Sequence, residues 1–268
     1  QDTNNLYATG RVSREVFKIP KADPVSISVL LASGTLTGDV LYPTCLSGFV
    51  YVPYGNGVAK IDTTSGATTL ITTGDQMFQV ANDGSTVFST ALNSGKLYEI
   101  NPTTNVATLR VSGLSNPAGL YITLSFVYVA QDVAGGTVLK ISRTTWVTTA
   151  TGAVSSGTND KPYGVAQIGI YLVVLTEGIA STTGNRNAYV YDTTTMASLL
   201  VIQSPATIGG QVKPMFTIAS DGVSIFGAFQ GSSGTVEISN WQASVPSSTT
   251  TTTATTTVTT ATSSTSTT

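Results

Sequence analysis

The sequence predicts an all-β protein, a six-bladed β-propeller with incomplete first and last blades and an extended Thr/Ser-rich C-terminal tail. The first observation is a strand–turn–strand segment at residues 57–71, in which a short polar turn joins two stretches rich in β-branched residues. The second observation is that this segment returns along the chain. Further copies occupy residues 95–109, 136–147 and 188–200, with shorter copies at 15–19 and 234–238.

The spacing of these copies gives the third observation. We align the copies on Ile19, Ile61, Ile100, Ile141, Tyr191 and Ile238, which lie 42, 39, 41, 50 and 47 residues apart. A period near 40 residues with several short strands in each unit is typical of propeller blades. Each unit is therefore expected to hold four strands, of which the repeated segment supplies the outer two.

The inner two strands of each unit read as nearly continuous apolar runs, which indicates burial on both faces. In the middle four units we expect them at residues 40–43 and 49–54, 77–81 and 87–91, 117–122 and 126–130, and 162–166 and 170–175. A polar loop at 177–187 widens the fifth unit. An Asp-Gly pair, which favours hairpin turns, separates the inner strands of the third unit at Asp83 and of the sixth at Asp221.

The two end units are predicted to be incomplete. The first shows strands at 6–9, 15–19 and 25–32 and no innermost strand. The last shows strands at 215–219, 225–229 and 236–238, and the stretch 239–246 makes a poor fourth strand. These predictions amount to 22 strands, two fewer than six complete blades would hold. An edge strand left open in this way invites pairing with another strand.

Composition narrows the classes of function. Charged residues make up 10% of the chain, the net charge is −2, and there is no histidine. We therefore expect no nucleic-acid partner, and no apolar run is long enough for a membrane span. The single cysteine, Cys45, excludes an internal disulfide and reads as a small buried apolar residue. The first residue is Gln1, which we interpret as the end left by a removed signal peptide.

The chain divides into a predicted propeller at residues 1–244 and a tail at 245–268. From residue 247 onward, 19 of 22 residues are Ser or Thr. Composition alone favours a disordered linker; the alternatives are an O-glycosylated stalk and a β-prone strand that adds to a sheet edge of another copy. The O-glycosylation candidates are Thr249, Thr250, Thr251, Thr252, Thr253, Thr255, Thr256, Thr257, Thr259, Thr260, Thr262 and Thr265.

Catalytic constellations are not apparent in the sequence. Without histidine there is no Ser-His-Asp or Cys-His pair, and we expect no cofactor and no enzymatic activity. Carboxylates such as Asp62 and Asp192 fall in turns, where they are expected to accept backbone hydrogen bonds. Polar residues before the innermost strands would ring the mouth of a central channel and are weak candidates for a ligand or metal site. They are Asp39, Gln76, Asn116, Lys161 and Lys213.

One further position is shared between the units. Residues Lys18, Lys60, Glu99, Lys140 and Glu237 all precede the aligned position by one residue. We interpret these charges as lying on the blade rim with their aliphatic stems packed, because five ligands in five different blades would not converge on one site.

Two stretches resemble known propeller repeats. Residues 49–66 resemble the YVTN-type repeat of surface β-propellers, and the Asn-Pro-Ala-Gly-Leu and Lys-Pro-Tyr-Gly-Val stretches that begin at Asn116 and Lys161 resemble the opening of NHL-type repeats. The resemblance covers about residues 5–242. It implies a propeller that acts as a secreted or surface scaffold. A lactonase branch of six-bladed propellers uses a carboxylate-and-asparagine calcium site, for which this chain shows no matching set.

The sequence leaves three hypotheses for function. The first is a non-enzymatic extracellular or cell-surface structural protein, a subunit of a fibre or surface layer whose tail links copies of the chain, carries O-linked glycans, or both. The second is a propeller lactonase or hydrolase with a metal in the central channel. The third is a monomeric carbohydrate- or protein-binding module on a glycosylated stalk.

Overall fold

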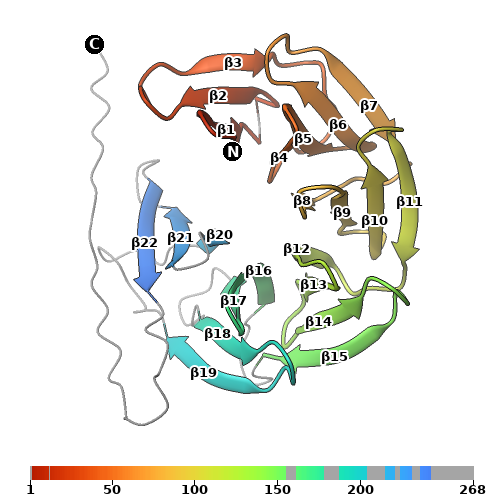
Figure 1. Ribbon diagram of the computed structural model, residues 1–268, viewed down its shortest axis with the longest axis vertical. Coiled ribbons are helices and arrows are strands. Elements are labelled where there is room, and N and C mark those ends of the chain that lie inside the picture. Colours follow the sequence, from red (N-terminus) through yellow and green to blue (C-terminus); the bar gives the residue numbers. More distant parts are fainter. Residues whose placement is uncertain are drawn as a thin grey trace. The chain divides into compact units, whose positions relative to one another are not determined.

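A computed structural model describes the backbone of residues 2–11, 13–154, 161–177, 187–203, 215–220, 224–230 and 236–242. These residues form antiparallel β-sheets in six groups, in which strands adjacent in sequence pair with one another (Figure 1). By its contacts the chain forms two compact units, one made of Gln1–Asp132 with Ile141–Thr149 and the other of Val133–Lys140 with Ala150–Thr268.

The first three sheets belong to the first unit. The first sheet contains β1 (Asn5–Thr9), β2 (Val16–Pro20) and β3 (Ser28–Leu31). The second contains β4 (Thr44–Leu46), β5 (Phe49–Tyr54), β6 (Gly57–Asp62) and β7 (Thr68–Thr72). The third contains β8 (Gln79–Asn82), β9 (Val87–Ala91), β10 (Lys96–Asn101) and β11 (Val106–Val111).

The remaining sheets follow the same order. The fourth contains β12 (Pro117–Ile122), β13 (Phe126–Gln131), β14 (Thr137–Ser142) and β15 (Thr148–Ala153). The fifth contains β16 (Lys161–Ile168), β17 (Tyr171–Glu177), β18 (Asn187–Asp192) and β19 (Ser198–Gln203). The sixth contains β20 (Met215–Ser220), β21 (Ser224–Gln230) and β22 (Val236–Gln242). Within the described backbone, the predicted pattern of four complete and two three-stranded sheets is confirmed.

Strand β5 shows how the core is built. Because side chains alternate between the two faces of a strand, Val50 and Val52 point to one side and Tyr51 to the other. Val50 and Val52 join a cluster with Val16 of the first sheet, whereas Tyr51 joins a cluster with Met77, ahead of the third sheet. All three β5 residues are buried. The prediction that the second strand of this unit is buried on both faces is therefore confirmed.

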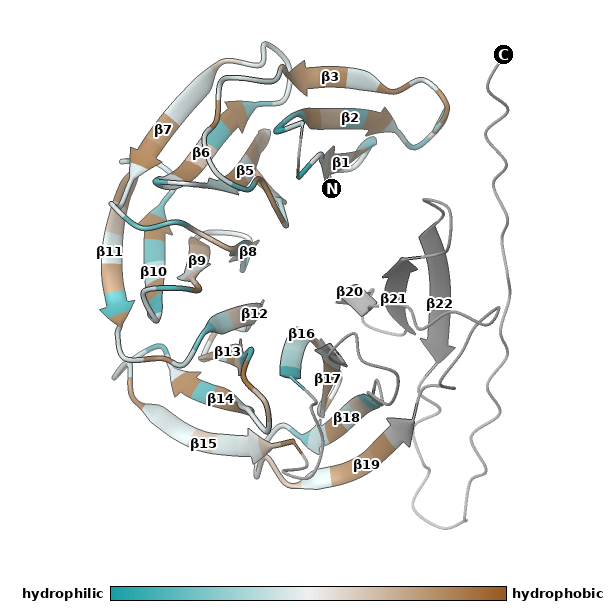
Figure 2. Cartoon of the chain, turned by 180° about the vertical axis from the view of Figure 1, so that it is seen from behind, coloured by the Kyte–Doolittle hydropathy of each residue, from teal (hydrophilic) through white to brown (hydrophobic). Residues whose placement is uncertain are grey.

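The outer strands differ from β5 and also from one another. Strand β15 has the sequence TTATGA and exposes most of its side chains. Strand β19 exposes Leu199, Leu200 and Val201. Figure 2 shows the contrast, since much of β15 is pale and much of β19 is brown. The fourth strand of a sheet in this fold can thus be rich in threonine, as in β15, or in leucine, as in β19.

Some predicted boundaries are wrong. The innermost strand of the second unit was expected at residues 40–43, but β4 begins at Thr44. Val40 is fully buried, and its apolar character reflects packing of a loop against the core between the first two sheets. Pro43 cannot donate a ladder hydrogen bond, which explains why the strand begins after it.

Two more strands are shorter than predicted. The stretch 77–81 was expected to be a strand, but β8 begins at Gln79, and Met77 is buried outside it. In the first unit the stretch 25–32 contracts to β3, because Val25 lies in a turn, Ile27 lies directly before the strand, and the two are 87% and 58% exposed. Apolar character alone did not distinguish turn residues from strand residues here.

The last described strand is longer than predicted. Strand β22 continues to Gln242, and Trp241 pairs with Ile225 near the start of β21. In the second sheet the corresponding pair is Val50 with Ile61. The sequence alignment of Ile238 with Ile61 is therefore wrong by three residues, because the last copy lacks the two consecutive threonines that mark this turn in the middle four units.

Three further observations complete the fold. Cys45 is half-buried beside the core of the first two sheets, and burial raises the pKa of its thiol. The part of the chain that the structure describes contains no helix that is long and apolar enough to cross a membrane. The tail lies outside the described residues, as does most of the predicted loop at 177–187.

Candidate functional site: predicted loop residues and contacts between sheets

Three of the predicted channel-mouth residues, Asp39, Gln76 and Asn116, belong to the first unit. Asp39 forms an ion pair with Arg11, with 2.7 Å between Arg11 Nη2 and Asp39 Oδ2. Asn116 has a left-handed backbone with φ of 45°, and its carbonyl accepts a 2.8 Å hydrogen bond from the amide of Asp132. Gln76 is exposed in the loop before β8. Asp39 thus contacts the connection between β1 and β2, and Asn116 contacts the residue that follows β13.

The other two candidates belong to the second unit. Lys161 is the first residue of β16 and is half-buried. Lys213 lies outside the described residues. A shared site formed by the five candidates therefore stays a prediction. Among the residues that it describes, no three His, Cys, Asp or Glu side chains gather closely enough to hold a metal ion.

Asp75, the neighbour of Gln76, is more deeply engaged than the predicted residue. Its side chain is 13% exposed and accepts hydrogen bonds from Tyr98 and from Lys96, whose Nζ lies 3.0 Å from Asp75 Oδ2. Burial alone would raise the pKa of Asp75, but hydrogen bonds from Tyr98, Lys96 and Ser94 outweigh it and hold that pKa below its usual value. Asp75 therefore ties the loop before β8 to β10 as an ionised carboxylate.

Asp62 and Asp192 begin the turns in which they were predicted, and Asp221 lies outside the described residues. Asp62 Oδ1 accepts hydrogen bonds of 2.9 and 2.7 Å from the amides of Thr64 and Ser65. Asp192 accepts the same pair from Thr194 and Thr195 at 2.9 and 2.8 Å. These hydrogen bonds lower the pKa of both carboxyls. The two groups stabilise the turns between the third and fourth strands and are not poised to exchange a proton near neutral pH.

Lysines in the shared position connect consecutive sheets. Lys18 Nζ donates to the carbonyl of Thr63 at 2.9 Å, and Lys60 Nζ donates to that of Pro102 at 2.6 Å. Each acceptor is the first residue after the third strand of the next sheet. The sequence predicted that the aliphatic stems of these lysines pack at the blade rim. The structure adds that their ammonium groups donate to backbone carbonyls of the turn, which need a hydrogen-bond partner.

The second unit repeats this contact. Lys140 is 8% exposed, and its Nζ donates to the carbonyl of Thr193 at 2.6 Å. Thr193 again follows directly after the third strand of the next sheet, β18. Lys60 adds a second feature, because its Nζ also lies 4.2 Å from the centroid of the Phe49 ring. Lys18, Lys60 and Lys140 thus each connect their own sheet to the turn after the third strand of the next sheet.

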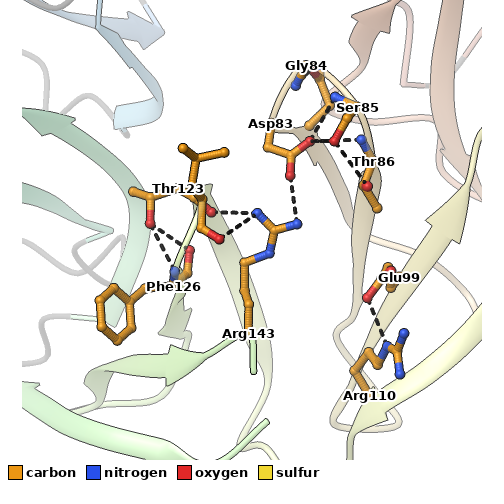
Figure 3. A network of polar contacts seen from close by, with 11 residues as sticks. Asp83, Gly84, Ser85, Thr86, Glu99, Arg110, Thr123, Phe126 and Arg143 are labelled. Carbon is orange, nitrogen blue, oxygen red and sulfur yellow. Dashed lines mark hydrogen bonds and ion pairs between the residues drawn. The ribbon is translucent and has the colours of Figure 1, made fainter. Parts of the chain in front are cut away.

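The junction between the third and fourth sheets departs from this pattern. The shared position holds Glu99, which cannot donate to a carbonyl and instead pairs with Arg110, at 2.8 Å between Oε2 and Nε. Arg143, the first residue after β14, reaches back to Asp83, with 2.7 Å between Nη2 and Oδ2. Figure 3 shows Arg143 pointing toward both Asp83 and the carbonyl of Thr123.

Asp83 lies at the centre of this network. Its side chain is only 4% exposed. Burial would raise its pKa, but hydrogen bonds from the amides of Ser85 and Thr86, the Ser85 hydroxyl and Arg143 keep that pKa below its usual value. The Arg143 guanidinium also lies 4.9 Å from the centroid of the Phe88 ring. The turn at Asp83 follows from the sequence, whereas its pairing with Arg143 was not predicted.

Comparison with known proteins shows the fold. No protein-family model matches the sequence, and no curated protein matches it significantly. Among solved structures, a nidogen/laminin complex matches with a TM-score of 0.65, 13% sequence identity and 89% of each chain covered. Streptogramin B lyase matches with a TM-score of 0.64 and 12% identity, over 91% of this chain and 81% of the other. The computationally designed protein Ika8 matches with a TM-score of 0.58 and 12% identity, over 90% and 69%.

These similarities, together with the repeated four-stranded sheets, define the protein class. The chain is a six-bladed β-propeller whose first and last blades have three strands in the described residues. At 12–13% identity the similarity extends to the fold alone. The matched structures include a complex between two proteins and, by its name, a lyase, so evidence for function has to come from this chain's own residues.

Proposed function

We propose that the protein is a non-enzymatic extracellular structural subunit that assembles with copies of itself. The observation that carries this proposal is the pair of incomplete sheets at the two ends of the chain. Within the described backbone, β1 and β22 are edge strands of three-stranded sheets. An edge strand presents a row of unpaired backbone donors and acceptors, which favours the addition of another strand.

Exposed apolar residues on an outer strand support association. Leu199, Leu200 and Val201 of β19 are 53%, 50% and 40% exposed, and the strand sequence SLLVIQ contains no charge. Edge strands of monomeric proteins are commonly protected by lysine, proline or a charge that points inward. Strand β19 has none of these features, so its outer edge is suited to contact another protein surface.

The tail supplies a means of linkage. Its 22 Ser/Thr-rich residues from 247 onward are uncharged and β-prone. We propose that the tail connects one copy to the next, carries O-linked glycans on its threonines, or does both. A relationship to YVTN- and NHL-type surface propellers, and an extracellular location, form part of this proposal. The geometry of the described residues gives no specific support to the lactonase or the monomeric binding module.

The proposal is tested by the state of association of the purified full-length protein. Light scattering and electron microscopy should show polymers, and a chain ending at Val245 should be monomeric. A matched control replaces residues 247–268 with a Gly/Ser sequence of equal length, which keeps the length and the lack of charge and removes the β-propensity. If the shortened chain forms the same polymers, the tail does not link subunits and the proposal fails. Intact-mass measurement reports the attached sugars separately.

A further inference from the structure

The number of residues between the third and fourth strands of the complete sheets indicates which part of the tail would form a fourth strand beside β22. In the four complete sheets the fourth strand begins five or six residues after the third strand ends, as with Asp62 and Thr68, or Asp192 and Ser198. Strand β22 ends at Gln242, and its partner Ser224 is the first residue of β21, just as Tyr171, the partner of Asp192, is the first residue of β17. The same spacing places the start of a fourth strand at residue 247 or 248.

The residues at that point have the composition of an outer strand of this chain. Residues 248–253 are one serine followed by five threonines. Strand β15 begins with Thr-Thr-Ala-Thr, and its residues Thr148, Thr149 and Thr151 are exposed. The same four-residue sequence occurs in the tail at 252–255 and again at 259–262. A threonine-rich stretch is therefore an established outer strand in this molecule.

We propose that residues 248–253 form the fourth strand of the sixth sheet by pairing with β22 of the same chain. The connection from Gln242 would be five residues long, with Pro246 in the turn. Such a short tether gives the attached segment a far higher effective concentration than a segment of a second molecule. The edge of β22 that pairs with no other described strand is then satisfied within one chain.

This assignment narrows the linkage proposed above, because it covers the edge of β22 within the chain and leaves β1 as the open edge of an end sheet. It leaves residues 254–268, which are 15 residues and can span about 50 Å when extended at roughly 3.3 Å per residue. Those residues remain available to reach a second copy or to carry sugars. The tail would therefore consist of a strand that completes its own blade and a free extension.

Amide hydrogen exchange of the full-length protein tests the assignment. We expect the amides of residues 248–253 to exchange at least about tenfold more slowly than those of 263–268, because strand pairing protects them. The double substitution Thr250→Pro and Thr251→Pro removes two adjacent amides, one of which must face β22, and should abolish the protection. Ser263→Pro with Ser264→Pro is the matched control and should leave residues 248–253 protected.

Two outcomes would overturn the assignment. Equal, unprotected exchange along the whole tail would show that no strand forms. Protection that falls on dilution would show that the strand comes from another molecule. A full-length variant with residues 254–268 replaced by Gly/Ser separates the two proposals. Retained protection without polymers supports both, whereas retained protection with unchanged polymers supports the strand and contradicts linkage by the tail.

Discussion

The junction between the second and third sheets and the junction between the third and fourth sheets solve the same problem with different chemistry. At the first, Lys60 donates to an uncharged carbonyl and lies over an aromatic ring. At the second, Arg143 pairs with the buried carboxylate of Asp83. A lysine directed at a carbonyl needs no ionised partner, whereas the arginine contact depends on a desolvated charge. The two junctions should therefore respond differently to mutation and to pH.

The largest effect is expected at the arginine junction. Asp83→Ala removes the partner of a guanidinium whose side chain is 17% exposed, together with two backbone caps of the turn. Breaking one side of a buried ion pair leaves a poorly solvated charge, so we expect a loss of about 3 kcal/mol in the free energy of unfolding. Urea unfolding of the wild type and the variant gives this value. A loss below about 1 kcal/mol would show that Arg143 regains full solvation.

The pH dependence provides a second measure of the same contact. The pKa of Asp83 is lowered in the folded protein, so its contribution is present above the unfolded value of about 3.9 and is lost as the pH falls toward the folded value. The difference in unfolding free energy between the wild type and Asp83→Asn should be constant above about pH 5 and shrink below about pH 4. A difference that grows on acidification would contradict a lowered pKa of Asp83 in the folded protein.

A smaller effect is expected at the lysine junction. Lys60→Met keeps most of the aliphatic stem but removes the donor to Pro102 and the contact with the Phe49 ring. We expect a loss of about 1–2 kcal/mol in the free energy of unfolding. Lys21→Met is a suitable control, because Lys21 donates to backbone carbonyls from an exposed position. This substitution should lower the free energy of unfolding by less than about 0.5 kcal/mol. Equal losses would mean that burial of Lys60 adds nothing.

The smallest effect is expected for the more exposed pair beside the arginine junction. Glu99 and Arg110 have side chains that are 25% and 34% exposed. Charge reversal by Glu99→Arg or Arg110→Glu should each cost about 0.5 kcal/mol, and the double reversal should recover most of that loss. A thermodynamic cycle of four unfolding curves measures the coupling. Additive losses would show that the pair is not coupled.

The sequence was sufficient for the architecture because its main signals are local. Apolar runs and Asp or Asn at turns depend only on near neighbours, and strands such as β5, β9 and β12 begin and end where their apolar runs do. The innermost strands β4 and β8 were less predictable, because residues such as Val40 are apolar for reasons of loop packing. The repeat alignment lost its reference point at the last unit, where the turn sequence is absent.

The contacts between sheets could be foreseen only in part. The shared lysine position was visible, but its acceptors are backbone carbonyls, which every residue possesses and which carry no sequence signal. The role of Arg143 as a contact between sheets could have been suspected. Arg143 occupies the repeat position that Thr63 and Thr193 hold in other units, and in the unit before it Glu99 replaces the shared lysine. The channel-mouth candidates followed from fold geometry alone, and that geometry gave no sign of the ion pair between Asp39 and Arg11.

The two buried faces of β5 have a consequence for how the first unit can fold. Each neighbouring sheet supplies one half of the apolar environment of that strand, so the second sheet in isolation would expose both faces to water. Sheets of this kind gain stability only in the company of their neighbours, as in other repeat architectures. A protease cut in one connecting loop would therefore release no independently folded fragment, and the unit should persist or unfold as a whole.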